Sequence, residues 1–262
     1  SWHMFNPVTY HQFGTNPENT QLGTSWDRTN AVSSILPGGS NHTLYRGWLD
    51  AFAQFSRSLT VSGVPWNPSE HLIPIIFRPF HEHNGSVFWW GGMNTTEDEY
   101  ITLWRFTVEY LRDTAGIHNL LYAYSPDYRF MSGRSSDYSF STLSVFEESY
   151  YYAYPGDSYV DVLGLDFYQS TFPVRIGIDD ATVGLAGLQS SLDFLVETSH
   201  NRSDLKIPAL TETGGQRWDL PNSELWWTTY LYPAVFATRL SGGQVAYVLT
   251  WRNWSTTDHN AP

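Results

Sequence analysis

Residues 73–91 of the chain read IPIIFRPFHEHNGSVFWWG. The apolar run at 73–77 predicts a buried strand, because short apolar runs rich in β-branched residues are typical of parallel sheets. Glu82 follows this run, between His81 and His83 and ahead of a series of aromatic rings. Such surroundings exclude water from a carboxyl group, so we expect the pKa of Glu82 to be raised and Glu82 to donate a proton near neutral pH.

A second acidic residue ends another apolar run. Residues 207–215 read IPALTETGG, which places Glu212 directly after five residues of strand-like sequence. Enzymes that hydrolyse glycosidic bonds commonly use two carboxyl groups, one as proton donor and the other as nucleophile or base. Together, Glu82 and Glu212 therefore indicate hydrolysis of a sugar polymer.

Apolar runs alternate with stretches of helical period along the chain, which is the pattern of βα units and a parallel sheet. The candidate strands cover residues 2–5, 73–77, 120–124, 160–167, 207–211 and 246–251. Apolar residues at helical spacing predict helices over 44–59, 100–111, 185–195 and from 223 to about 239. Thr96 and Glu99 have the spacing of a capping box at the start of the second of these helices.

The number of candidate strands decides the architecture that we expect. Six candidates are two fewer than the eight strands of a closed barrel, and 262 residues suit one large α/β domain. We expect a single α/β domain over residues 1–262, a (β/α)8 TIM barrel whose first two βα units lie upstream of residue 1. An open, doubly wound sheet is the alternative, but no glycine-rich phosphate loop follows any candidate strand.

In a barrel of this kind the chemistry lies at the carboxyl ends of the strands. Several polar and aromatic residues lie at or just beyond such ends: His3, Glu82, Asp166, Tyr168, Glu212, Trp251 and Arg252. We expect these side chains to converge on one face, with Glu82 and Glu212 nearly opposite each other across the mouth.

Composition excludes several classes of partner and site. The formal net charge is −12 and no cluster of Lys or Arg stands out, so a nucleic acid would be repelled. Aromatic residues make up 17% of the chain, which fits stacking on sugar rings, although most of the rings are expected in the core. The chain has no Cys, which excludes disulfides and thiolate metal sites, and no apolar stretch is long enough for a membrane span.

In the segments around Glu82 and Glu212, the chain resembles glycoside hydrolase family 26, whose best-known activity is that of an endo-β-1,4-mannanase. The acid/base motif of the family, Arg-Pro-Phe-His-Glu followed by Asn-Gly and Trp-Trp-Gly, is matched at 78–91 with small variations. The nucleophile motif of the family resembles residues 211–214, and the similarity extends to residues 1–7, 166–168 and 250–253.

The resemblance implies a hydrolase that retains anomeric configuration, with Glu82 as acid/base and Glu212 as nucleophile. It also implies that Tyr168 hydrogen-bonds Glu212. The substrate-binding residues that it implies are His3, His81, Trp89, Trp90, Asp166, Tyr168, Trp251 and Arg252, with Arg78 and Asn84 as structural support. No metal and no organic cofactor are expected.

Alternatives remain open at this point. The spacing of His81 and His83 is also that of a metal pair in a barrel, with His3 as a further ligand, so a metal-dependent amidohydrolase or deacetylase is a second hypothesis. A non-catalytic sugar-binding module is a third. Within the glycosidase reading, loops decide between mannan and β-1,3-xylan or mixed-linkage β-glucan, and between endo action and an exo-acting mannobiohydrolase.

The expected partner is a β-mannan polysaccharide or oligosaccharide, namely mannan, glucomannan or galactomannan. We expect no nucleic-acid or membrane partner, and a monomer. The implied location is secreted or periplasmic, although the first residues, SWHMF, do not have the basic and apolar regions of a signal peptide.

Overall fold

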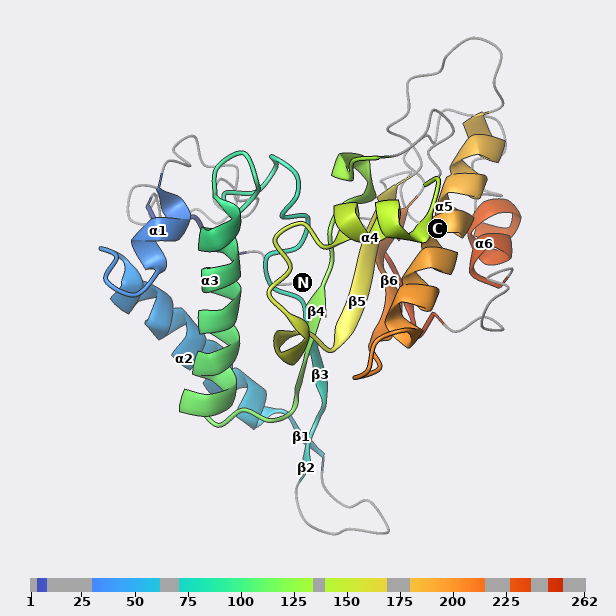
Figure 1. The fold of residues 1–262 in the computed structure, drawn as a ribbon. Coiled ribbons are helices and arrows are strands. Elements are labelled where there is room, and N and C mark those ends of the chain that lie inside the picture. Colours follow the sequence, from blue (N-terminus) through green and yellow to red (C-terminus); the bar gives the residue numbers. More distant parts are fainter. Residues whose placement is uncertain are drawn as a thin grey trace, which may run out of the picture. The chain divides into compact units, whose positions relative to one another are not determined.

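Two parallel-stranded units make up the fold, one formed by residues 1–124 with 153–161 and the other by 125–152 with 162–262. The structure is a computed structural model that describes residues 4–8, 30–61, 71–133, 140–168, 180–214, 227–236 and 245–251 (Figure 1). In the part of the chain so described, no helix is long and apolar enough to cross a membrane.

In the first unit, a βαβ crossover positions the loop that carries Glu82. Strand β3 (Ile75–Phe77) pairs in parallel with β4 (Leu120–Tyr124), and helix α3 (Glu97–Glu109) with its π-helical extension η2 (Tyr110–Thr114) connects them (Figure 1). A parallel pair requires such a crossover, because its strands run in the same direction. The Glu82 loop occupies the stretch between β3 and α3.

Helix α3 begins where the sequence predicts it. The backbone N–H of Glu99 donates to Thr96 Oγ1 (3.2 Å), and the N–H of Thr96 donates to Glu99 Oε2 (3.0 Å), which confirms the capping box. Three acidic residues fill the first turn, where negative charge interacts favourably with the helix dipole. The start of α3, and with it the end of the Glu82 loop, is therefore fixed by local chemistry.

The rest of the first unit packs around this crossover. Helix α2 (His42–Ser58) contacts β3 through Phe52, whose ring stacks on that of Phe77 with centroids 4.4 Å apart. It contacts α3 through a hydrogen bond of 2.6 Å between Tyr45 and Thr107. The remaining elements are α1 (Ala31–Ile35), the antiparallel pair β1 (Thr60–Val61) and β2 (His71–Leu72), and the 3-10 turn η4 (Asp157–Tyr159).

In the second unit, three parallel strands hold the residues around Glu212. Strand β5 (Val162–Tyr168) pairs with β6 (Ile207–Gly214), which pairs with β7 (Val248–Thr250). All seven residues of β5 are buried and all of β6 but Ile207, as expected for strands covered on both faces. Among the described residues of this unit, the helices are η3 (Tyr128–Phe130), α4 (Leu143–Tyr150), α5 (Asp180–His200), η7 (Trp227–Leu231) and α6 (Tyr232–Phe236).

A β-bulge interrupts the pairing of β5 with β6. Leu165 pairs with Leu210, whereas the next residue, Asp166, pairs with Glu212, so Thr211 is one extra residue on β6. The Thr211 hydroxyl donates to Asp166 Oδ1 (2.7 Å). A bulge changes the direction in which the following side chains point, and this one lies directly before Glu212.

Gly164 makes room for this bulge, and its replacement is expected to destabilise the protein. A Cβ at Gly164 would lie 2.3 Å from Thr211 Cγ2, and Thr211 is fully buried. We therefore expect Gly164→Ala to lower the free energy of unfolding by about 1–3 kcal/mol, as overpacking does, measured by urea unfolding.

Gly47→Ala is the control, because Gly47 is within helix α2 and a Cβ there meets nothing within 4 Å. That variant should gain about 0.5–1 kcal/mol. Equal destabilisation of both variants would contradict the assignment of the bulge.

The predicted elements correspond to the observed ones with several differences. The strands predicted at 73–77, 120–124, 160–167, 207–211 and 246–251 are β3 to β7, but β6 continues to Gly214 and β5 to Tyr168. Met4 and Phe5, the described residues of the strand predicted at 2–5, are not in a strand, so that prediction is wrong for them. The helix predicted from 223 to 239 is described only over 227–236, where it starts as π-helix. Helix α4 was not predicted.

Candidate active site

Glu82 lies in a tightly held turn directly after β3. Its φ is 52° and that of Phe80 is 49°, so both residues adopt the left-handed conformation that L-residues seldom take. Each such residue costs about 1–2 kcal/mol, and the surrounding structure must offset that cost. This backbone is thus held in an unusual shape at the residue for which acid/base chemistry is predicted.

Hydrogen bonds to four consecutive carbonyls hold the turn in this shape. The Phe80 carbonyl accepts from the Tyr100 hydroxyl (3.0 Å), and the His81 carbonyl from Trp90 Nε1 (2.8 Å). The carbonyls of Glu82 and His83 accept from the backbone N–H groups of Gly85 (3.0 Å) and Gly92 (2.7 Å). Every backbone acceptor from 80 to 83 is therefore fixed, by donors from α3 and from the loop itself.

Aromatic rings pack against one another in the loop that carries Glu82, a residue that is 6% exposed. The rings of Phe88 and Trp90 stack with centroids 4.6 Å apart and an interplanar angle of 3°. The His81 imidazole lies against Phe88, with centroids 4.5 Å apart. This is the water-poor environment that the sequence predicts, while the raised pKa of Glu82 stays a prediction.

Trp89 and Trp90 support the loop in this structure. Both rings are buried, and the indole N–H of Trp89 donates to the Met4 carbonyl (3.2 Å) as that of Trp90 donates to His81. Their predicted role in substrate binding stays a prediction. Arg78 is buried and Asn84 is half-buried, and their predicted role as structural support stays a prediction as well.

The two histidines beside Glu82 have different partners. His83 Nε2 lies 3.0 Å from the Tyr124 hydroxyl on β4, and its ring stacks on Tyr100 with centroids 4.4 Å apart. His81 packs on Phe88 instead. Over the described ranges, no group of three or more His, Cys, Asp or Glu side chains is arranged to hold a metal ion. His3, the proposed further ligand, lies outside the described residues.

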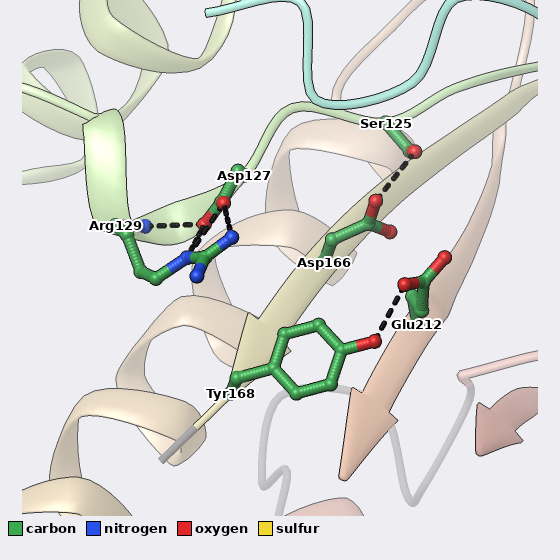
Figure 2. A network of polar contacts seen from close by, with 6 residues as sticks. All are labelled: Ser125, Asp127, Arg129, Asp166, Tyr168 and Glu212. Atoms are coloured by element: carbon green, nitrogen blue, oxygen red, sulfur yellow. Dashed lines mark hydrogen bonds and ion pairs between the residues drawn. The ribbon is translucent and has the colours of Figure 1, made fainter. Parts of the chain in front are cut away.

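Glu212 lies near the end of β6 and is oriented by Tyr168 of β5. The Tyr168 hydroxyl donates to Glu212 Oε1 at 2.5 Å, which is the hydrogen bond implied by the family resemblance (Figure 2). Both side chains are buried, with 6% of Tyr168 and 5% of Glu212 exposed. A phenol O–H that donates to a carboxylate oxygen fixes the direction of the carboxylate.

Asp166 is fully buried, and both of its carboxylate oxygens accept hydrogen bonds from neighbouring side chains. Its predicted role in substrate binding stays a prediction. Its Oδ1 accepts from the Thr211 hydroxyl, and its Oδ2 accepts from Ser125 Oγ (3.3 Å) (Figure 2). Trp251 follows β7 with 37% of its surface exposed, and its backbone N–H donates to the Thr213 carbonyl (2.9 Å). Arg252 lies outside the described residues.

The sequence predictions missed an ion pair close to Tyr168. Asp127, directly after β4, is fully buried and forms an ion pair with the Arg129 guanidinium (Figure 2). Burial raises the pKa of the Asp127 carboxyl, Arg129 lowers it through hydrogen bonds and charge, and the charge of Glu212 raises it. The sequence does place Asp127 soon after the strand at 120–124, much as it places Glu82 after the strand at 73–77, but it does not show the contact with Tyr168.

Glu82 belongs to the first unit and Glu212 to the second. The prediction that they face each other across one mouth stays a prediction, as does the prediction that two βα units lie upstream of residue 1.

Comparison with known sequences gives a consistent family of relatives. The sequence model of Glycosyl hydrolase family 26 matches residues 1–219. A mannan endo-1,4-beta-mannosidase of Bifidobacterium adolescentis is 35% identical over 240 residues, which cover 90% of this chain and 22% of that protein. Another, from Bacillus subtilis, is 32% identical over 188 residues, which cover 68% of this chain and 45% of that protein.

Solved structures show the same similarity. A family 26 β-mannanase from Bacteroides ovatus is 35% identical with a TM-score of 0.72, and the match covers 100% of this chain and 62% of that chain. A modular endo-β-1,4-mannanase from Cellulomonas fimi is 33% identical with a TM-score of 0.71, covering 99% of this chain and 49% of that one. The chain therefore spans less than two thirds of these relatives. The matches, with the parallel strands and helical crossovers, confirm the predicted α/β fold of the (β/α)8 barrel class.

Proposed function

Because the chain belongs to glycosyl hydrolase family 26, we propose that it hydrolyses internal β-1,4-mannosidic bonds in mannan, glucomannan or galactomannan. The observation that supports this proposal most directly is the buried pair of Tyr168 and Glu212, because a nucleophilic carboxylate must be ionised and aimed. Glu82, in its strained and water-poor turn, supplies the second carboxyl group.

The proposed first step breaks the glycosidic bond. Glu212 attacks the anomeric carbon while Glu82 transfers its proton to the departing glycosidic oxygen, which leaves a glycosyl ester on Glu212. In the second step, Glu82 removes a proton from water, the resulting hydroxide attacks the anomeric carbon, and Glu212 leaves as a carboxylate.

Two inversions at one carbon give overall retention, so the anomer formed first identifies the mechanism. We expect proton NMR of the fresh reaction on soluble mannan to show the β-anomer of the new reducing end before mutarotation. An α-anomer formed first would contradict the assignment of Glu212 as nucleophile, because it signifies single displacement by water.

Product profiles decide the substrate and the mode of action. We expect glucomannan and mannan to yield oligosaccharides of mixed length early in the reaction, as random internal cleavage does. Lichenan or β-1,3-xylan as the preferred polymer would replace the substrate assignment, and a single disaccharide from the start would indicate exo action. Binding of mannan without any product would favour a sugar-binding module. Loss of activity with a chelator and its return with zinc would favour a metal-dependent hydrolase.

We further propose that the protein acts outside the cytoplasm, in a secreted or periplasmic location. The support for this is physical, since a polymer such as mannan is too large to reach an enzyme within the cell.

A further inference from the structure

We propose that Tyr100 is a positioning residue for the proton donor, because from helix α3 it holds the turn on both sides of Glu82 and so places the backbone that carries the carboxyl group. This inference rests on the proposed function, since the position of Glu82 matters for turnover only if Glu82 is the acid/base. Tyr100 and the whole of the turn belong to the first unit.

On the N-terminal side of Glu82, Tyr100 contacts Phe80 twice. Its hydroxyl donates to the Phe80 carbonyl (3.0 Å), and its ring meets the Phe80 ring edge-on, with centroids 6.3 Å apart. Phe80 is fully buried and adopts a φ of 49°. A residue other than glycine keeps such a conformation only where its surroundings over-determine it, and the two contacts with Tyr100 supply part of that constraint.

On the C-terminal side of Glu82, the same tyrosine ring lies against His83. The two rings stack with centroids 4.4 Å apart and an interplanar angle of 21°. His83 Nε2 lies 3.0 Å from the Tyr124 hydroxyl, so the imidazole is fixed between α3 and β4. Glu82, with its φ of 52°, therefore lies within the stretch that a single side chain of α3 contacts at both ends.

Tyr100 is itself held firmly enough to act as an anchor. Its backbone N–H donates to the carbonyl of Thr96 (3.0 Å), the residue whose capping box fixes the start of α3. The side chain is buried, and burial raises the pKa of the Tyr100 phenol well above its ordinary range. The hydroxyl therefore remains a hydrogen-bond donor throughout the pH range of a hydrolase assay.

Loss of the Tyr100 hydroxyl should impair proton transfer more than any other part of the reaction. Without the bond at the Phe80 carbonyl, the turn can relax toward ordinary backbone conformations and carry the Glu82 carboxyl away from the glycosidic oxygen. A leaving group that is a weak acid depends on proton transfer, whereas a strongly acidic phenol departs without it. A general disturbance of the fold, by contrast, slows both kinds of substrate equally.

The test is Tyr100→Phe, which keeps the aromatic ring and removes one hydroxyl. Its kcat/KM, which reports the first step, is measured on mannan and on aryl β-mannosides whose phenols span a range of acidity. We expect a loss on the order of 10-fold on mannan and of less than about 2-fold with the most acidic phenol, so that the dependence on phenol acidity is steeper than in the parent. An equal loss on all substrates, or no loss on any, overturns the inference.

Tyr45→Phe is the matched control. Tyr45 is likewise buried in the first unit, and its hydroxyl is also bonded to α3, through Thr107 Oγ1 (2.6 Å), but not to the Glu82 turn. Its loss should therefore leave the dependence on phenol acidity as in the parent. Thermal unfolding of both variants sets an assay temperature at which each is folded. A dependence that is equally steep in Tyr45→Phe would overturn the inference, because it would follow from any weakening around α3.

Native-state hydrogen exchange separates failure of this inference from failure of the proposed function. The N–H groups of Gly85 and Gly92 donate to carbonyls of the Glu82 turn, so their exchange reports the turn without substrate. We expect both to be protected in the parent and in Tyr45→Phe, and to exchange about 10-fold faster in Tyr100→Phe. That result supports the inference even if the parent hydrolyses no polysaccharide, in which case the proposed function alone fails. Unprotected Gly85 and Gly92 in the parent, or unchanged exchange in folded Tyr100→Phe, overturns the inference.

Discussion

Glu212→Ala is expected to reduce hydrolysis of mannan by on the order of 10⁴-fold or more, since removal of a catalytic nucleophile leaves little of the enzymatic rate. The fold should persist, because a single substitution at the end of β6 typically costs about 0.5–3 kcal/mol. Steady-state release of reducing sugar measures the loss, and thermal unfolding measures the integrity of the variant. The matched control is Glu148→Ala on the exposed surface of α4, which should retain parental activity.

Rescue of Glu212→Ala by an added nucleophile tests directly whether Glu212 is the nucleophile. The small space left by Glu212→Ala can admit azide or formate, which then attacks the anomeric carbon of a substrate with an activated leaving group. We expect azide to restore turnover of an aryl β-mannoside and to give the α-glycosyl azide, because one displacement inverts the centre. Parental activity of Glu212→Ala on mannan would remove Glu212 from the mechanism altogether.

Glu82→Ala is expected to separate substrates by their leaving groups. On mannan, loss of the proton donor should cost about 10²- to 10⁴-fold in kcat/KM. On an aryl β-mannoside with a strongly acidic phenol, the first step needs little protonation and should remain fast. The second step still lacks its base, so a burst of phenol followed by slow turnover is expected in a rapid-mixing experiment.

A second variant keeps this test independent of the unusual backbone. Because Glu82 is buried in a turn with a φ of 52°, alanine at this position also leaves a space in the turn, whereas Glu82→Gln preserves the shape of the side chain. Both variants should show the same dependence on the leaving group. If Glu82→Gln hydrolysed mannan as fast as the parent, another residue would be the proton donor.

The strands, and the positions of Glu82 and Glu212 relative to them, could be predicted because their signals are local, while the catalytic roles of the two glutamates stay predictions. An apolar run followed by polar residues indicates a buried strand and its carboxyl end, and β3 and β6 both follow this pattern. The capping box of α3 is equally local, since two side chains of fixed spacing decide it.

Features that depend on pairing between distant segments were not predictable. Whether Thr211 is bulged depends on the register of β6 against β5 and on the space at Gly164, neither of which the sequence of β6 contains. The ion pair of Asp127 and Arg129 was missed because, in the sequence, it is an ordinary acid and base two residues apart. Its contact with Tyr168, some 40 residues further along the chain, depends on the fold.

The burial of Trp89 and Trp90 could not be predicted from the sequence either. Exposed tryptophans stack on sugars and buried ones complete a core, and composition does not distinguish the two. Here the indole N–H groups donate to backbone carbonyls, and one of those carbonyls is that of His81, next to Glu82.

A Glu82 loop that is transplanted into another scaffold needs a residue from outside the loop to keep its backbone conformation. The carbonyl of Phe80 is anchored by Tyr100, which belongs to α3 and not to the loop. A graft that ends before this helix would carry the acid but lose an anchor, and its turn would relax toward the common right-handed conformations. The smallest transferable module therefore extends from β3 into α3, and a substitution of Trp90 would also disturb the backbone beside Glu82, because its indole N–H donates to the His81 carbonyl.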